Sequence, residues 1–249
     1  MLTLGLTGAF VFLGYVVFGL TGFGASVVAI PLIAQVIPLK LAVPMMLIMD
    51  LVAGIFVGAR NNRDVDRPEL KALVLWILLG MVVGLTLLVS APEPVLLVAL
   101  GIFAVFQSTR NLLLRPNHQA IASAWRIAYG SIGGAFTSLF GTGGPIYAMY
   151  LSRRIPNEAQ RRATLALLIW FTSFARLALF IVAGLMWQPS LFQLVLVCLP
   201  LCLLGAYSGS AIRKRLQTHH LNRLVWVIVG LAGLSLLARY LPKAFALLG

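Results

Sequence analysis

Residues 139–145 read Leu-Phe-Gly-Thr-Gly-Gly-Pro, and residues 19–24 read Gly-Leu-Thr-Gly-Phe-Gly. Each glycine-rich stretch interrupts a run of apolar residues. When the chain is slid along itself by about 120 residues, the two stretches coincide and Gly22 falls over Gly141. The sequence therefore predicts two related halves, each of which opens with a broken apolar hairpin.

The same register continues beyond the glycine-rich stretches with small gaps. Pro38 meets Pro156, and Gly84 meets Gly205. Each half then consists of one hairpin followed by three crossings, and three crossings reverse the orientation of the second half. This pattern is an inverted-topology repeat, which is typical of secondary transporters that bind their substrate near the bilayer midplane, at the repeat interface.

The composition indicates that the solvent of this chain is a lipid bilayer. Of its 249 residues, 61% are hydrophobic and only 10% are charged, whereas a soluble domain carries about 25% charged residues. Apolar runs long enough to cross about 30 Å of hydrocarbon recur from end to end. We therefore expect an all-α polytopic membrane protein with about eight to ten helical segments and one integral-membrane domain.

The predicted segments divide between two repeats. The first repeat, 1–115, contains a re-entrant hairpin at 2–37 and helices at 41–59, 70–89 and 94–114; the second, 116–249, contains a hairpin at 121–152 and helices at 160–186, 191–212 and 221–241.

The net charge of +13 comes from basic residues in short loops, so it is an orientation signal and not a surface for nucleic acid. The clusters are Arg60, Arg63, Arg67 and Lys71; Arg110, Arg115 and Arg126; Arg153, Arg154, Arg161 and Arg162; and Arg213, Lys214, Arg215 and Arg223. The connections at 91–93 and 187–189 contain no basic residue. The positive-inside rule places the clusters in the cytoplasm and both termini outside, and it makes the two hairpins face opposite ways.

A glycine in an apolar sequence can have either of two roles: it can allow close packing between helices, or it can form a functional turn. We expect packing for Gly8, Gly14, Gly80 and Gly101. In the two turns, the clustering, the matched positions and the following Pro145 favour a functional turn, because proline at a first helical position lacks only an amide that is already unpaired.

The helices after the two turns begin with amides that lack partners and with the positive end of a helix dipole, so both N-termini can bind one small oxyanion. The predicted binding residues are Thr21, Gly22, Gly24, Ala25, Ser26, Gly141, Thr142, Gly143, Gly144 and Arg176.

Asp50 and Arg176 lie inside apolar runs, where each charge costs about 3 kcal/mol or more to insert. One interpretation is that they pair with each other and lock the structure. In another, Arg176 contacts the anion and Asp50 takes part in coupling to protons, and a third places them at the periphery. Polar residues at 107–111 are expected to bond to a neighbouring helix.

Other classes of protein find little support. An aspartyl protease of the membrane needs two buried carboxylates, and only Asp50 qualifies; His118, His219 and His220 lie in predicted loops, away from any buried nucleophile. We therefore expect no catalytic residue, no enzyme activity and no metal site, and we interpret Cys198 and Cys202 as buried thiols. No GxxxxGK[ST] loop occurs, so ATP is not the direct energy source. A channel or a membrane scaffold stays an open alternative.

The two glycine-rich stretches, with Ile30-Pro31 after the first and Pro145 after the second, resemble the sulfite exporter family TauE/SafE of bacterial inner-membrane proteins, over essentially the whole chain. The resemblance implies a secondary transporter, in the export direction, of small sulfur-containing anions such as sulfite or sulfoacetate. It departs from the family at Ala25 and Ser26, which replace a fuller glycine run, so another small organic anion is an alternative. No cofactor is expected beyond a proton or sodium gradient, and the partners are lipids, the anion and, as an open possibility, a second copy of the chain.

Overall fold

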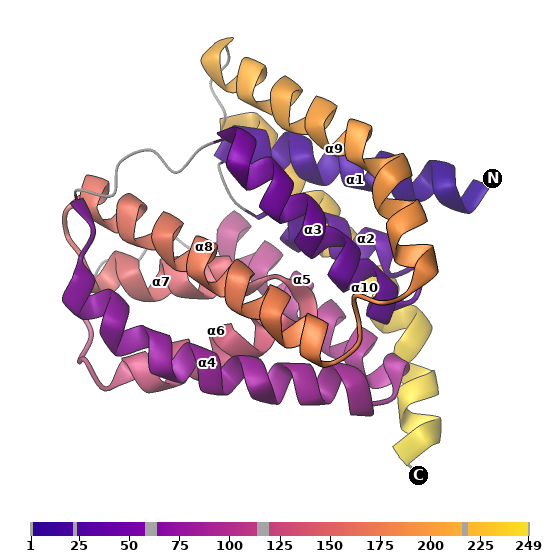
Figure 1. Cartoon of the computed structure of the whole chain (residues 1–249), viewed down its shortest axis with the longest axis horizontal. Helices are drawn as coiled ribbons and strands as arrows, with labels where there is room; N and C mark the ends of the chain where they lie inside the picture. The colour runs from indigo at the N-terminus through magenta and orange to yellow at the C-terminus, as the bar shows by residue number, and fades with distance from the viewer. Residues whose placement is uncertain (1, 22–23, 58–63, 114–119, 216–218, 249) are drawn as a thin grey trace. The chain divides into compact units, whose positions relative to one another are not determined.

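The computed structural model describes residues 2–21, 24–57, 64–113, 120–215 and 219–248, and its regular structure is entirely helical, as predicted. Within these ranges there are ten helices: α1 Leu2–Thr21, α2 Ala25–Ile33, α3 Leu39–Val57, α4 Arg67–Ser90, α5 Glu93–Leu113, α6 Trp125–Phe140, α7 Gly143–Arg154, α8 Glu158–Val182, α9 Pro189–Arg215 and α10 His219–Leu248 (Figure 1). Six of them, α1, α4, α5, α8, α9 and α10, are long and apolar enough to cross a membrane.

Local sequence signals position the starts of two helices. The carboxylate of Asp66 accepts a hydrogen bond from the Glu69 amide (3.1 Å), and Pro68 occupies the first turn of α4. The Asn157 side chain accepts bonds from the amides of Ala159 and Gln160 at the start of α8. Both caps satisfy amides that would otherwise lack partners.

The chain forms two compact units, and each unit draws helices from both predicted repeats. Unit 1 contains Met1–Met46, Ser90–Arg115 and Pro189–Gly249, and therefore holds α1, α2, α5, α9 and α10. Unit 2 contains Leu47–Val89 and Pro116–Gln188, and therefore holds most of α3 together with α4, α6, α7 and α8. The division of the sequence into repeats at residue 115 stays a prediction.

In unit 1, α1 packs closely against α9 (Figure 1). A Cβ on Gly205 would lie 2.6 Å from the carbonyl oxygen of Phe12, and one on Gly209 would clash with the carbonyl oxygen of Val16. Only glycine permits this backbone approach, which is the usual way in which membrane helices maximise their contact.

Unit 2 repeats this packing between α6 and α4. A Cβ on Gly80 would clash with the carbonyl oxygen of Ser131, and one on Gly84 with that of Ala135. The offset that aligns Gly22 with Gly141 also aligns Phe12 with Ser131 and Val16 with Ala135. By these contacts Gly84 corresponds to Gly209, one turn beyond the Gly205 with which the sequence register aligned it.

The packing interpretation of the glycines outside the turns is confirmed. A Cβ on Gly8 would lie 2.6 Å from a methyl of Leu201, one on Gly14 would lie 2.7 Å from the side chain of Ala29, and one on Gly101 would lie 3.0 Å from the carbonyl oxygen of Gly233.

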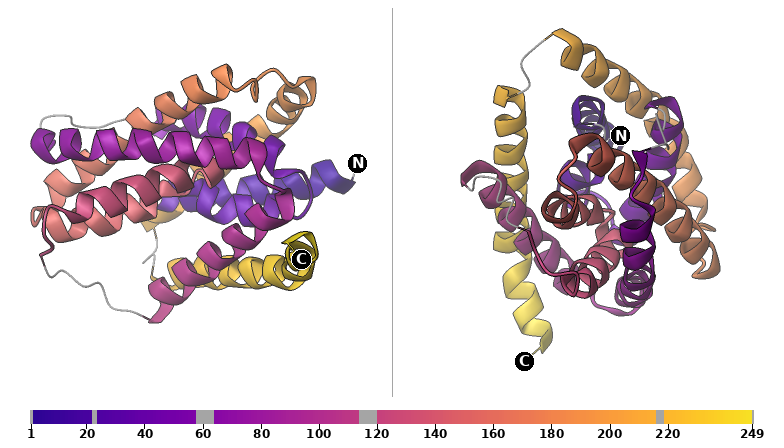
Figure 2. Two further views of the ribbon diagram at one scale, coloured as in Figure 1. Left: turned by 90° about the horizontal axis from the view of Figure 1, so that it is seen from below. Right: turned by 90° about the vertical axis from the view of Figure 1, so that its left-hand side faces the viewer.

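A second pair of helices, α5 and α10, also belongs to unit 1 (Figure 2). Val17, Val28, Ala104 and Val229 form a buried cluster that joins this pair to α1 and α2. The Ser108 hydroxyl donates to the carbonyl of Trp226 (2.6 Å), which confirms for this residue the predicted bond to a neighbouring helix. The Gln107 side chain is buried, and its two amide atoms have no partner among the described residues.

Large apolar side chains are exposed along the helices, as expected for surfaces that contact lipid. On α4 they include Leu75, Leu79, Val82 and Val83. A soluble domain rarely exposes such continuous apolar surface, so the burial pattern agrees with the composition. The protein is therefore a multi-pass membrane protein.

Candidate anion-binding site

The break between α6 and α7 lies in the glycine-rich stretch that decided the prediction. Gly141 adopts the left-handed conformation (φ 66°), which other residues rarely adopt, and its amide donates to the carbonyl of Thr137 (2.9 Å). The Thr142 amide donates to the carbonyl of Phe136 (3.2 Å). These bonds close the end of α6, and α7 begins directly afterwards at Gly143.

Two buried hydroxyls at this break have no hydrogen-bond partner among the described residues. Thr142 occupies the N-cap position of α7, yet its side chain does not cap the helix, and its Oγ1 is buried and unpartnered. Ser138, in the last turn of α6, is fully buried and its Oγ is also unpartnered. An unsatisfied buried polar group costs about 1–3 kcal/mol, so two of them beside a helix N-terminus indicate a place for a polar ligand.

The first turn of α7 rests directly on α6. A Cβ on Gly143 would overlap Thr137 Oγ1 and lie 2.6 Å from the carbonyl oxygen of Gly133. Thr137 Oγ1 donates to that carbonyl (2.8 Å) and lies 2.7 Å from the Tyr147 hydroxyl. Since the threonine proton is already used, the Tyr147 hydroxyl must be the donor in the second bond. The bonds fix α7 on α6.

Arg176, on α8, reaches the end of α6 from the interior of unit 2. Its side chain is 3% exposed, its Nη1 donates to the carbonyl of Thr137 (2.9 Å), and its guanidinium lies 5.8 Å from the ring centroid of Phe180. Its Nη2 lies 3.7 Å from Oδ2 of Asp50, on α3. The two charges therefore pair, and Arg176 is not peripheral.

The first hairpin also has a left-handed glycine at its break, but this glycine is the N-cap of the second helix, whereas Gly141 is the C-cap of the first. Gly24 is left-handed (φ 88°) at the N-cap of α2, and Ala25 and Ser26 are buried in its first turn. Thr21 ends α1, and Gly22 lies outside the described residues. The Tyr15 hydroxyl donates to the carbonyl of Met46 over a longer distance, 3.4 Å. The predicted roles of the first-hairpin residues stay predictions.

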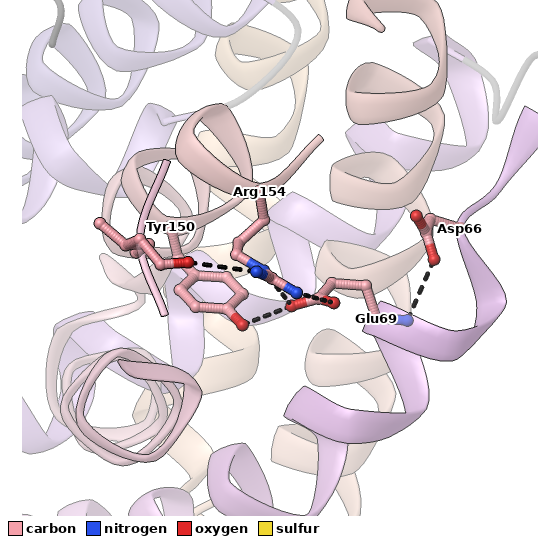
Figure 3. A network of polar contacts seen from close by, with 5 residues as sticks. Asp66, Glu69, Tyr150 and Arg154 are labelled. Atoms are coloured by element: carbon pink, nitrogen blue, oxygen red, sulfur yellow. Dashed lines mark hydrogen bonds and ion pairs between the residues drawn. The ribbon is translucent and has the colours of Figure 1, made fainter. Parts of the chain in front are cut away.

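A second polar cluster joins the start of α4 to the end of α7 (Figure 3). The Glu69 carboxylate accepts a hydrogen bond from the Tyr150 hydroxyl and two from Arg154, at 3.2 and 3.4 Å. Arg154 also donates to the carbonyl of Ile121 (3.1 Å), just before α6. This cluster fixes the start of α6 and the end of α7 to α4. The end of α6 and the start of α7 then meet in a defined position at the break.

Sequence reasoning missed several of these residues. Glu69 could have been found from the Asp66-x-x-Glu69 pattern of a helix start, and Arg154 was assigned only to topology although it forms an ion pair. Ser138 and Thr137 carry no sequence signal, because a hydroxyl in an apolar helix most often bonds to its own backbone, as Ser173 does here.

Comparison with known proteins agrees with this architecture. The profile of the family described as Sulfite exporter TauE/SafE matches residues 6–236. A curated protein named "Probable inner membrane transporter protein TsaS", from Comamonas testosteroni, is 26% identical over 195 residues, which cover 77% of this chain and 81% of that protein. No solved structure matches the chain. The match over nearly the whole chain means that this protein belongs to the sulfite exporter TauE/SafE family of membrane transporters.

Proposed function

We propose that the protein is a secondary transporter in the bacterial inner membrane that exports small sulfur-containing anions, such as sulfite or organosulfonates, by alternating access. The observation that carries this proposal is the pair of buried hydroxyls at the break between α6 and α7, those of Ser138 and Thr142, which have no partner among the described residues. Family membership supports the substrate class, and the protein is proposed to have no enzyme activity.

A sulfonate or sulfite head group offers three oxygens that each accept hydrogen bonds. The donors available around the break are the hydroxyls of Ser138 and Thr142, the first amides of α7 and the guanidinium of Arg176. Hydrogen bonds that involve a charged partner are about twice as strong as neutral ones. The N-terminus of α7 favours an anion, and the C-terminus of α6, which ends at the same break, offsets part of this effect. A ligand with several acceptor oxygens and a negative charge would satisfy all of these groups.

The glycine at position 143 has a direct role in this arrangement. A side chain at position 143 would overlap the Thr137 hydroxyl and approach the carbonyl oxygen of Gly133, so glycine is what allows the first turn of α7 to rest on α6 beside the proposed donors. The predicted contribution of Gly24, Ala25 and Ser26 to the same anion stays a prediction, as do the termini outside the membrane and coupling to a proton or sodium gradient.

Counterflow in proteoliposomes tests the proposal. Purified protein is reconstituted with methanesulfonate or sulfite inside, and uptake of labelled sulfite is measured, with acetate and lactate as anions without sulfur. We expect saturable uptake that an internal sulfur anion accelerates, because a transporter returns faster when it is loaded. Flux that internal anion leaves unchanged would instead identify a channel, and acceleration by acetate or lactate alone would identify a permease for another organic anion.

Matched variants connect the activity to the site. Arg176→Lys and Thr142→Val should lower the rate of counterflow, since each removes donors at the break. Arg162→Lys is the control, because Arg162 lies on the same helix in an exposed ion pair with Glu158 and should leave the rate unchanged. Equal rates for all three variants would contradict the site.

A further inference from the structure

The positive charge of the site is already balanced within unit 2. Arg176 is 3% exposed and Asp50 is 20% exposed, and the two charged groups lie 3.7 Å apart. The remaining side chains at the break, those of Thr137, Ser138, Thr142 and Tyr147, are neutral hydroxyls. The partial charges of the two helix ends that meet there, negative at α6 and positive at α7, oppose each other.

Arg176 is held in place by more than Asp50. Its Nη1 donates to the carbonyl of Thr137 at 2.9 Å, and its guanidinium lies over the ring of Phe180. The contact to Asp50 is longer and its carboxylate more exposed. An anion that binds the guanidinium therefore shares it with the Asp50 carboxylate, and the two negative groups face each other across one positive charge.

We propose that Asp50 makes the site selective for a head group with a single negative charge, such as a sulfonate or hydrogen sulfite, the protonated form of sulfite, over a doubly charged head group such as sulfate; this inference rests on the proposed function. Arg176 and the hydroxyls stabilise the first negative charge. Among the side chains described at the break a second negative charge finds no second cation. It also repels the Asp50 carboxylate in a poorly hydrated interior, where Coulomb interactions are several times stronger than in water. Asp50 is thus a specificity-determining residue.

Methanesulfonate and sulfate form the probe pair, because they have nearly the same shape and differ by one charge. Binding of each to the purified full-length protein is measured by calorimetry and thermal shift at neutral pH and equal ionic strength. For the unmodified protein we expect methanesulfonate to bind at least about tenfold more tightly than sulfate. In Asp50→Asn the preference should fall below about threefold or reverse, and in Asp50→Glu it should persist.

Glu158→Gln is the charge-matched control, because it removes one exposed carboxylate of the same unit outside the site, and it should leave the preference unchanged. If neither anion binds, the proposed function fails together with this inference. If sulfate binds the unmodified protein as tightly as methanesulfonate, or if Asp50→Asn keeps the preference, the inference is wrong while the proposed function stands. Should Asp50→Asn not fold, the unmodified protein and Asp50→Glu decide the question.

Discussion

The two broken hairpins, α1–α2 and α6–α7, are each interrupted at a glycine-rich stretch and differ in the polar side chains that the structure describes around the break. Both breaks contain a left-handed glycine, Gly24 or Gly141, and in both hairpins the first helix packs on a glycine-bearing helix from the other predicted half. Only at the second break does the structure describe an arginine bonded to the end of the first helix, together with two unpartnered buried hydroxyls. The comparison indicates that a glycine break and close helix packing can occur in both hairpins without the charged and polar groups described at the second break.

The difference also affects how firmly each half-helix is held. In α6–α7, Tyr147 bonds to Thr137 at 2.7 Å, and the outer ends are joined to α4 through Glu69. In α1–α2, the buried Tyr15 makes a long bond of 3.4 Å. Of the two tyrosine bonds the shorter one is in the second hairpin, and we therefore expect its half-helix to be held more firmly, as suits an N-terminus that keeps a fixed geometry around a ligand.

The largest expected effect tests the shared geometry. In Gly84→Leu the new side chain would overlap the carbonyl of Ala135 on α6, and in Gly209→Leu it would overlap that of Val16 on α1. Since backbone cannot yield cheaply, we expect each variant to lose about 4 kcal/mol or more of stability, measured as yield and thermal midpoint of purified protein. Gly5→Leu is the control, because no atom lies within 4 Å of its Cβ position. Tolerance of leucine at only one of the two sites would show that the two contacts are not equivalent.

The next effect tests the charge that separates the hairpins. Arg176→Leu leaves Asp50 in the interior without its arginine and removes the bond to Thr137. Breaking a buried ion pair on one side costs about 3–5 kcal/mol, and we expect a loss of that size in unfolding measurements, together with loss of anion binding. Arg162→Leu removes an exposed pair and should change stability by less than about 1 kcal/mol. Equal losses in the two variants would mean that Arg176 acts only through helix propensity.

Much of the fold could be predicted from the sequence, because the length of each apolar run and the glycine-rich breaks between runs determine where helices begin and end. The break at residues 141–142 and the boundaries of α4 and α5 fall close to their predicted positions. The structure also shows that each compact unit combines helices from both predicted halves, and this could not be predicted. The arrangement depends on which helix packs against each glycine-bearing helix face, as Gly80 packs against Ser131. The periodicity of a sequence shows which face of a helix packs, but not which helix packs against it.

The candidate site was predicted in part. Asp50 and Arg176 could be identified because charged residues are rare inside apolar runs, where a charge needs a partner. Ser138 and Gln107 were not expected to lack partners, since whether a hydroxyl or amide in a helix is satisfied depends on neighbours that the sequence does not reveal. Gln107 in particular was expected to bond to a neighbouring helix, and that expectation was wrong for its side chain among the described residues.

A smaller effect distinguishes the two buried tyrosines. Tyr147→Phe removes the 2.7 Å bond to Thr137, whereas Tyr15→Phe removes the longer, 3.4 Å bond to Met46. Hydrogen bonds between membrane helices average about 0.6 kcal/mol, so we expect Tyr147→Phe to lower stability by about that amount and Tyr15→Phe by less. Thermal midpoints of the two variants, purified in parallel, check the order. A larger loss for Tyr15→Phe would contradict the claim that the second hairpin is held more firmly.

The smallest stability effect carries the sharpest functional contrast. Thr142→Val replaces a hydroxyl that has no partner among the described residues by a methyl group of nearly the same size, so unfolding stability should stay equal or rise by a few tenths of a kcal/mol. Anion binding should nevertheless weaken, because the ligand loses a donor at the first turn of α7. Thr86→Val, at an exposed hydroxyl that bonds to its own helix, should leave binding unchanged. A threonine that served packing alone would show the reverse: lower stability with anion binding intact. Gain of stability with loss of binding is the expected behaviour of a polar group kept buried for a ligand.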